Sequence, residues 1–244
     1  MRVKSSILTA ALGLGAIAQC GGGSPTNPAP SGSASASPGA TSGVTYVGHN
    51  HYSVPLDTND ASAITKPSGT QTGDFLISAA MAPEDTPPVV PPGWTQIGGN
   101  ITMGPGWPLY YVMAVAYRVV QSGDTSWTWT HSAATVTHAY RNVSATSPVH
   151  ASIGPTRHQT ADPPIGNLTA SSAGGDASVY ICLGMYHANI THPPNYTGRV
   201  ENTAADYGSG DRLGLTPGQT TGGNLSSSDD INNDRGIVHV ILRR

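Results

Sequence analysis

The sequence predicts an all-β fold: a single domain built as a β-sandwich of jelly-roll-like type. From Val44 onward no stretch shows helical periodicity, whereas short β-branched or aromatic runs recur between clusters of Gly, Pro, Asn, Asp and Ser. The chain also contains 20 prolines, which favour many loops over long uninterrupted strand pairing. These features are typical of sandwiches and jelly rolls.

The expected strands follow the apolar runs. They cover residues 44–48, 52–57, 73–81, 94–97, 109–120, 125–131, 133–141, 149–153, 165–170, 176–187, 196–202, 211–215 and 235–243. In "DTSWTWTHS" the side chains of Trp127, Trp129 and His131 share one face of a strand, opposite a face of hydroxyl groups. In "PLYYVMAVAYRVV", residues 108–120, both faces are largely apolar, which indicates a central strand covered on both sides.

The stretch "GDFLISAAMAPEDTPPVVPPGWTQI", residues 73–97, is interpreted as scaffold. Its first two residues are a turn pair that precedes an apolar strand, and four prolines stiffen the loop that returns at Trp94. We expect Trp94 to pack against one end of the sandwich rather than to stack on a ligand.

Three segments differ in composition. Residues 1–19 have the positive start and short apolar run of an export signal, and residues 20–43 form a Gly/Ser/Pro/Ala-rich tether before the sandwich domain at 44–244. Cleavage after Ala18 and lipidation of Cys20 both fit the end of the signal. The tether that follows directly favours lipidation of Cys20, so we expect a lipid-anchored protein at the cell surface or outside the cell.

Charge and cysteine content narrow the range of partners. Only 10% of the residues are charged and the net charge is −3, which argues against nucleic acid as a partner. Beyond the signal no apolar run reaches membrane-spanning length, so any membrane attachment is expected through Cys20 alone. Cys182 lies in the apolar run "ASVYICLGMY" and is expected to be a buried free thiol.

The order of several motifs resembles a family of modules. "TGDFLISAAM", "PPGWTQI", "VMAVAYRVV", "TWTHS" and "AYRNVSATSPVHAS" follow one another over about residues 70 to 155. This order is similar to all-β modules of bacterial secreted or surface proteins and phage structural proteins. The chain departs from their pattern at Asn142, where the family usually has Gly, and at His150, where it usually has Asp. The resemblance implies a jelly-roll-like sandwich used for display, adhesion or attachment, and it implies no catalytic residue.

Two candidate metal sites are present in the sequence. His49 and His51 occupy alternate positions, which on a strand would offer two imidazoles to zinc or copper, with a third ligand from His187 or His192. The segment "DDINNDRG" places oxygen ligands at alternate positions, as calcium loops do; they are Asp230, Asn232 and Asp234. Surface or turn histidines and a polar turn remain the favoured interpretations, so no cofactor is expected.

The aromatic residues suggest ligand stacking as a second role. Trp and Tyr rings stack on sugar faces, and the candidates here are Trp107, Tyr110, Trp127 and Trp129. Most aromatic residues must nevertheless build the core, because the chain contains a single Phe. Trp107 is the best exposed candidate, since loop-forming residues flank it.

The sequence therefore favours a non-catalytic surface module that binds glycan or a partner protein. A self-assembling surface or fibre subunit is a variant of this hypothesis, because low charge permits strand-edge association. The alternative is a secreted hydrolase or metal-dependent enzyme acting on polysaccharide. That alternative needs a convergent polar cleft with a perturbed titrating group, and the nucleophile motif GxSxG is absent from the sequence.

Overall fold

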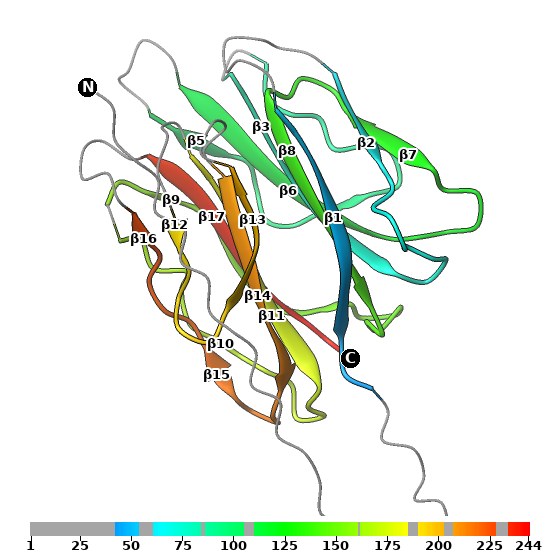
Figure 1. Cartoon of the computed structure of the whole chain (residues 1–244). Helices are drawn as coiled ribbons and strands as arrows, with labels where there is room; N and C mark the ends of the chain where they lie inside the picture. The colour runs from blue at the N-terminus through cyan, green and yellow to red at the C-terminus, as the bar shows by residue number, and fades with distance from the viewer. Residues whose placement is uncertain are drawn as a thin grey trace, which may run out of the picture. The chain divides into compact units, whose positions relative to one another are not determined.

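The computed structural model describes residues 42–53, 61–83, 86–104, 110–160, 162–184, 190–202, 207–227 and 234–244. All regular secondary structure within these ranges is β-strand, and none of them holds a helix with the length and hydropathy needed to cross a bilayer. Two large antiparallel sheets face each other (Figure 1), which confirms the predicted all-β sandwich.

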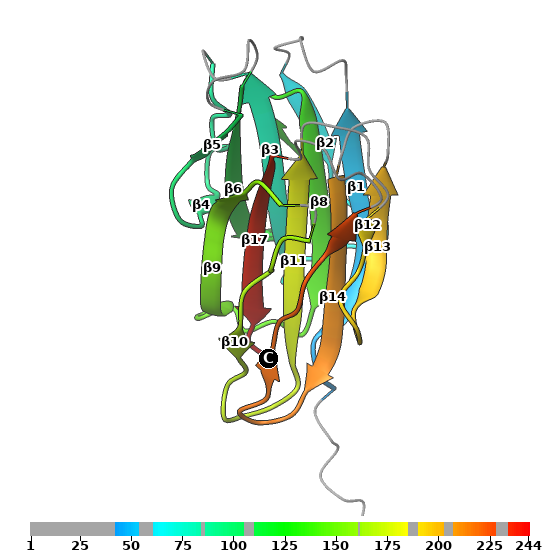
Figure 2. The same ribbon diagram turned by 90° about the vertical axis from the view of Figure 1, so that its left-hand side faces the viewer.

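The first sheet has the strand order β1-β8-β3-β6-β4, with β5 pairing to β6 beside β4. Its strands are β1 (Thr45–Ser53), β3 (Phe75–Pro83), β4 (Thr95–Gln96), β5 (Ile101–Met103), β6 (Tyr111–Val119) and β8 (Ala134–Arg141). The second sheet has the order β13-β14-β11-β17-β9, seen face-on in Figure 2. Its strands are β9 (Val149–His158), β11 (Asp176–Gly184), β13 (Thr197–Asn202), β14 (Tyr207–Leu215) and β17 (Arg235–Leu242). The chain thus completes the first sheet before it begins the second.

Short two-stranded ribbons cover the outer faces of both sheets (Figure 1). The ribbon outside the first sheet pairs β2 (Ser62–Thr65) with β7 (Ser126–Trp129). Outside the second sheet, β10 (Leu168–Thr169) pairs with β15 (Thr220–Thr221), and β12 (Ile190–Thr191) pairs with β16 (Ser226–Ser227). The described part of the chain is therefore layered as ribbon, sheet, sheet and ribbons.

These layers explain why the central strands are apolar on both faces. Phe75 and Ile77 of β3 enter the main core between the sheets, whereas Leu76 and Ala80 face the β2–β7 ribbon. In the second sheet β11 behaves in the same way, because Tyr180 and Cys182 face the outer ribbons and the alternate residues face the main core. Burying both faces of a strand removes roughly twice the apolar area that a half-solvated strand buries, at about 25 cal/mol per Å².

Trp94 is buried on the outer face of the first sheet, with 8% of its surface exposed. Its ring meets Trp127 edge-on at 5.3 Å between centroids. Gly93 has a φ of +77°, a left-handed backbone conformation that favours glycine at this turn. The expected packing role of Trp94 is confirmed, but Trp94 packs under the β2–β7 ribbon and not at one end of the sandwich.

Candidate functional site

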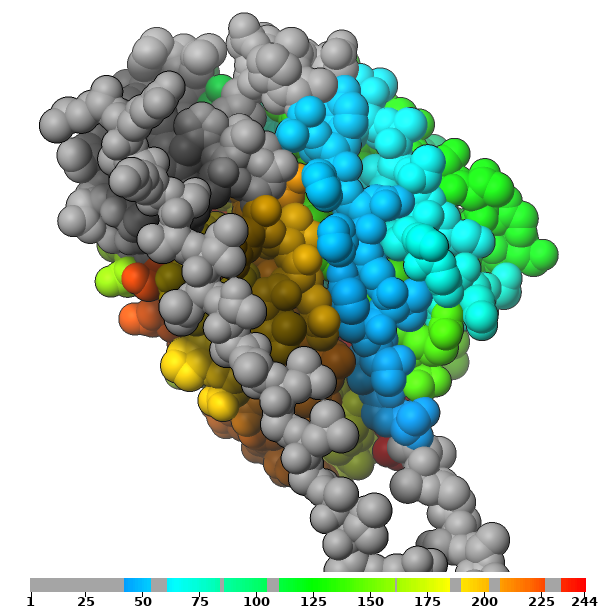
Figure 3. Space-filling model, viewed as in Figure 1, coloured from blue at the N-terminus to red at the C-terminus, as the bar shows by residue number. Residues whose placement is uncertain are grey.

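A shallow pocket lies between β1 and the β2–β7 ribbon. Its volume is about 140 Å³, and its lining residues are Asn50, His51, Tyr52, Ala63, Ile64, Thr65 and Thr135. Figure 3 shows β1 in blue along the surface, with β2 in cyan beside it. The lining combines an amide, hydroxyl groups and a phenol, so it offers both hydrogen bonds and an aromatic surface.

The free edge of β2 forms one wall of this pocket. Lys66 N–H donates to Thr125 O at 2.9 Å, and successive residues of an antiparallel strand point alternately toward and away from the partner strand. The backbone N–H and C=O groups of Ala63 and Thr65 therefore point away from β7 and toward β1. Asn50 confirms this direction, because its Nδ2 donates to Thr65 O at 2.7 Å and to Thr65 Oγ1 at 2.9 Å.

Three histidines of the first sheet lie side by side on the face that is turned toward the second sheet: His49 and His51 on β1 and His138 on β8. His49 lies directly opposite His138 in the β1–β8 pairing. The His49 ring is 6.0 Å from both the His51 ring and the His138 ring, measured between centroids. Exposure falls along this row, because His51 is exposed, His49 is half-buried and His138 is fully buried. The His51 ring also contacts the buried Tyr207 of β14, with centroids 5.7 Å apart.

An ion pair within the second sheet contacts the first sheet next to the histidines. Arg199 of β13 donates from Nε and Nη2 to the two carboxylate oxygens of Asp211, at 2.8 and 2.7 Å. Tyr140 donates its hydroxyl to Asp211 at 3.1 Å, and the Arg199 guanidinium lies 4.1 Å from the centroid of the Tyr46 ring. Because Asp211 is 1% exposed, burial of its charge depends on these partners.

Burial controls the ionisation of this cluster. It lowers the pKa of His138 to about 3, with smaller contributions from the nearby His49 and Arg199. Burial also lowers the pKa of His49, and the charge of His51 lowers it further. The Tyr46 hydroxyl bonds His49 Nδ1 at 2.8 Å, and burial raises the pKa of Tyr46 to about 12. The rings of His49 and His138 are therefore uncharged at neutral pH.

A second buried network lies on the outer face of the second sheet. Ser178 Oγ is 2.6 Å from both His239 Nε2 and the Tyr196 hydroxyl, and it accepts a hydrogen bond from Thr221 Oγ1 at 3.1 Å. A serine so close to a histidine resembles a nucleophile and base pair. Ser178 and His239 are both fully buried, however, so substrate cannot reach the serine and the network is structural. Burial lowers the pKa of His239 to about 4.

The two buried histidines predict a loss of stability in acid. Their folded pKa values of about 3 and about 4 lie below the unfolded value of about 6.5. Below pH 6.5 these two histidines bind protons in the unfolded chain but not in the folded chain. The free energy of unfolding therefore falls as the pH drops toward the folded pKa values. At pH 5 each of His138 and His239 should cost about 2 kcal/mol relative to pH 7. Urea unfolding at both pH values measures this difference.

His138→Leu provides the control for the acid effect. The groups that face His138 are Tyr46 and His49 of β1, Tyr140 of β8 and Arg199 of β13. Leucine does not titrate, so the difference in unfolding free energy between pH 7 and pH 5 should shrink by about 2 kcal/mol, whatever the absolute stability of the variant. An unchanged difference would mean that His138 is protonated in the folded protein at pH 5.

The structure separates the aromatic candidates. Trp127 and Trp129 belong to β7 and point to the inner side of the β2–β7 ribbon, where Trp129 is fully buried and Trp127 is 8% exposed. The Trp129 indole Nε1 donates to Ser78 Oγ at 3.0 Å. Their proposed role in ligand stacking is therefore wrong, because neither ring face is accessible. Tyr110 is 38% exposed but is not among the residues that line the described pocket. Trp107 lies outside the described residues.

The structure contradicts the proposed role of Asp234 as a calcium ligand. The Asp234 carboxylate is 4% exposed and accepts from Arg157 Nε at 2.8 Å and from Gly104 N–H at 2.6 Å. A bound cation would have to displace the Arg157 guanidinium, so Asp234 belongs to an ion pair and is not a calcium ligand. Asp230 and Asn232 lie outside the described residues.

The other metal candidates do not converge. His192 hydrogen-bonds the Tyr180 hydroxyl through Nδ1, and its Nε2 is 2.5 Å from Glu201 Oε1, so its partners are not those of His49 and His51. His187 and Cys20 lie outside the described residues, and Cys182 is buried, as predicted, with no disulfide to another described residue. Within the described ranges no three His, Cys, Asp or Glu side chains are arranged to hold a metal ion.

Several residues of the site were not anticipated from the sequence. His138 sits in an apolar run, and nothing in that run indicates that it faces His49. The pocket residues Asn50, Thr65 and Thr135 are common polar types without a motif. A register between residues 45–53 and 134–141 would have found His138, but register is a property of the folded pair.

Comparisons of the chain with protein-family models, curated proteins and solved structures found no match.

Proposed function

We propose that the protein is an exported, lipid-anchored and non-catalytic surface module that binds glycan in the pocket between β1 and β2. The observation that carries the proposal is the lining of that pocket, where the ring of Tyr52 lies among the amide of Asn50 and the hydroxyls of Thr65 and Thr135. Glycans have apolar ring faces and a rim of hydroxyl groups, so they are recognised by an aromatic surface together with fixed donors and acceptors.

The dimensions of the pocket favour a limited ligand. Its volume of about 140 Å³ is below the roughly 300–1,000 Å³ of sites that enclose a drug-sized molecule. One sugar ring, at the end or along the side of a longer glycan, matches this size. The peptide groups of Ala63 and Thr65 on the β2 edge add backbone donors and acceptors to the side chains.

The position of the pocket suits a tethered protein. The predicted tether joins the domain at Val44, next to the first residue of β1. Tyr52 is eight residues further along the same strand, about 26 Å away at the usual rise of a β-strand. The pocket is therefore well separated along β1 from the residue at which the predicted tether joins the domain.

Substitutions in the pocket test the proposal. Tyr52→Ala should weaken binding of the full chain to a glycan ligand by about tenfold, because loss of an aromatic contact costs about 1 kcal/mol or more. Thr65→Val removes one hydroxyl at nearly constant shape and should weaken binding less. Affinity is measured by titration calorimetry with ligands selected from a panel of soluble oligosaccharides.

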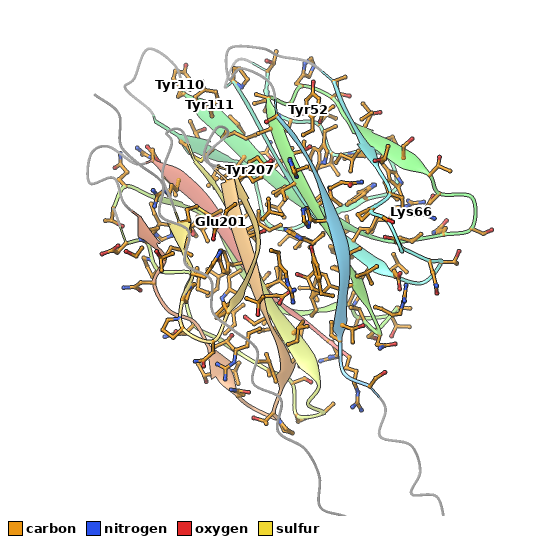
Figure 4. The ribbon with its side chains drawn as sticks, in the orientation of Figure 1. Tyr52, Lys66, Tyr110, Tyr111, Glu201 and Tyr207 are labelled. Carbon is orange, nitrogen blue, oxygen red and sulfur yellow. The ribbon has the colours of Figure 1, made fainter. Side chains whose placement is uncertain are left out.

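Tyr110→Ala is the matched control. Tyr110 is an exposed tyrosine that the described pocket does not include, and Figure 4 shows it at the start of β6, well separated from Tyr52. Its replacement should leave glycan affinity unchanged. Equal losses in the two tyrosine variants, or a loss only with Tyr110→Ala, would contradict a site between β1 and β2.

A further inference from the structure

The imidazoles of His49 and His51 lie side by side at the surface of β1. Their rings are nearly parallel, with 21° between the planes and 6.0 Å between the centroids. Alternate residues of a strand point to the same side, and both rings here look toward the second sheet. Figure 3 places β1 along the surface next to that sheet, so solvent reaches the row at the exposed His51.

We propose that His49 and His51 bind a divalent transition-metal ion, copper(II) in preference to zinc. Imidazole nitrogen suits both ions, and first-row divalent ions bind a given nitrogen site most tightly at copper. The protein supplies two ligands, and water completes the coordination. His51 is also among the residues that line the pocket between β1 and β2, although its ring looks toward the second sheet, and the copper test requires no glycan.

Tyr46 orients one of the two ligands. Its hydroxyl lies 2.8 Å from His49 Nδ1. In the tautomer protonated on Nδ1, that nitrogen donates to the tyrosine oxygen and Nε2 carries the lone pair for the metal. Metal-binding histidines in proteins are commonly fixed through their other ring nitrogen in this way. The phenol therefore acts as a positioning residue for His49.

The second ligand has the freedom to close the site. Metal–nitrogen bonds of about 2.0–2.1 Å require the two donor nitrogens to come within about 4 Å of each other. His51 is exposed, so its ring can turn about its two side-chain torsions toward the held ring of His49. The Arg199 guanidinium lies 4.1 Å from the centroid of the Tyr46 ring, and Asp211 neutralises its charge through two hydrogen bonds.

The buried end of the row takes no part in the site. His138 is fully buried beside His49, and neither of its ring nitrogens has a hydrogen-bond partner within the described residues. It lies away from solvent, so the protein ligands are His49 and His51 alone.

The test is copper titration of the full chain without a histidine tag. Every protein carries Cys20→Ser, because that thiol would itself bind or reduce copper, and Cys182 is buried. One equivalent of CuCl₂ should give an electron paramagnetic resonance spectrum with hyperfine splitting from imidazole nitrogen. His51→Ala should weaken copper binding by about tenfold or more, and Tyr46→Phe by about tenfold, within the range found when outer partners of metal ligands are removed.

His150→Ala is the control, since His150 is an exposed histidine whose Nδ1 contacts Arg243 and which is not part of the row. The copper affinity of the His150→Ala variant should equal that of the parent. Zinc should compete with copper only in excess. Equal copper affinity in the parent and in the His49→Ala, His51→Ala double variant would overturn the proposal, as would a spectrum without nitrogen splitting in a parent protein that melts cooperatively.

Discussion

Replacing Asp211 with alanine is expected to lower the free energy of unfolding by about 3–5 kcal/mol. The carboxylate is 1% exposed, and it accepts two hydrogen bonds from Arg199 and one from the Tyr140 hydroxyl. Without it, the guanidinium remains at the junction of the two sheets with no counter-charge, and the buried tyrosine hydroxyl loses its acceptor. Urea unfolding followed by tryptophan fluorescence at neutral pH measures the loss.

A double-mutant cycle separates the ion pair from the space it fills. Arg199→Ala together with Asp211→Ala removes both charges, so the double variant should lose clearly less stability than the sum of the two single variants. Additive losses, or an Asp211→Ala variant within about 1 kcal/mol of the parent, would show that the pair behaves as a solvated surface pair.

Trp94→Ala is expected to cost a similar amount, about 3–5 kcal/mol, as is usual for large buried aromatic side chains. The ring fills the space under the β2–β7 ribbon and packs edge-on against Trp127. Its indole nitrogen has no hydrogen-bond partner within the described residues, so the loss comes from packing. Thermal and urea unfolding of the variant measure it.

Two further variants identify packing as the cause. Trp94→Phe keeps most of the apolar volume and should lose clearly less stability than Trp94→Ala. Val89→Ala, on the same loop but 53% exposed, should change stability by no more than about 0.5 kcal/mol. An unchanged melting curve for Trp94→Ala would mean that the ring is exposed. Trp94 would then again be a candidate for stacking on a ligand.

The fold class was predictable because its signal is local and repeated. The runs that became β3, β6, β8 and β17 are dense in apolar residues and bounded by turn formers, and their predicted bounds differ from the observed ones by two residues or fewer. Strands with small or polar residues were harder to predict. The short β2 and β5 were missed, and β1 was predicted as two strands because His49, Asn50 and His51 interrupt its apolar pattern.

The beginning of β14 was predicted wrongly because of its glycines: the strand starts at Tyr207, whereas the predicted strand starts at residue 211. Gly208 and Gly210 weaken a strand pattern by propensity. They are needed because neighbouring side chains lie against the backbone: a Cβ at Gly208 would stand 2.7 Å from Ile190, and one at Gly210 would stand 2.9 Å from Tyr180. The sequence alone does not show which side chains will lie against the backbone of these glycines.

The site was less predictable than the fold, because it depends on what each strand face meets. Alternation correctly placed Trp127 and Trp129 on one face, yet only the layered structure reveals that this face is turned inward. His49 and His51 were correctly predicted to share a side, whereas their neighbours His138 and Tyr207 come from distant segments. The resemblance to surface and phage modules, the export signal and the lipid anchor stay predictions.

Retention of the protein on a panel of polysaccharides, with assay of the reducing ends released, tests glycan binding without catalysis. The full chain is incubated with insoluble and soluble glycans, with and without added copper, zinc or calcium. We predict retention on at least one glycan, weakened by Tyr52→Ala and not by Tyr110→Ala, with no new reducing ends. Released products would identify an enzyme, and absence of retention on every glycan would contradict the proposed binding site between β1 and β2.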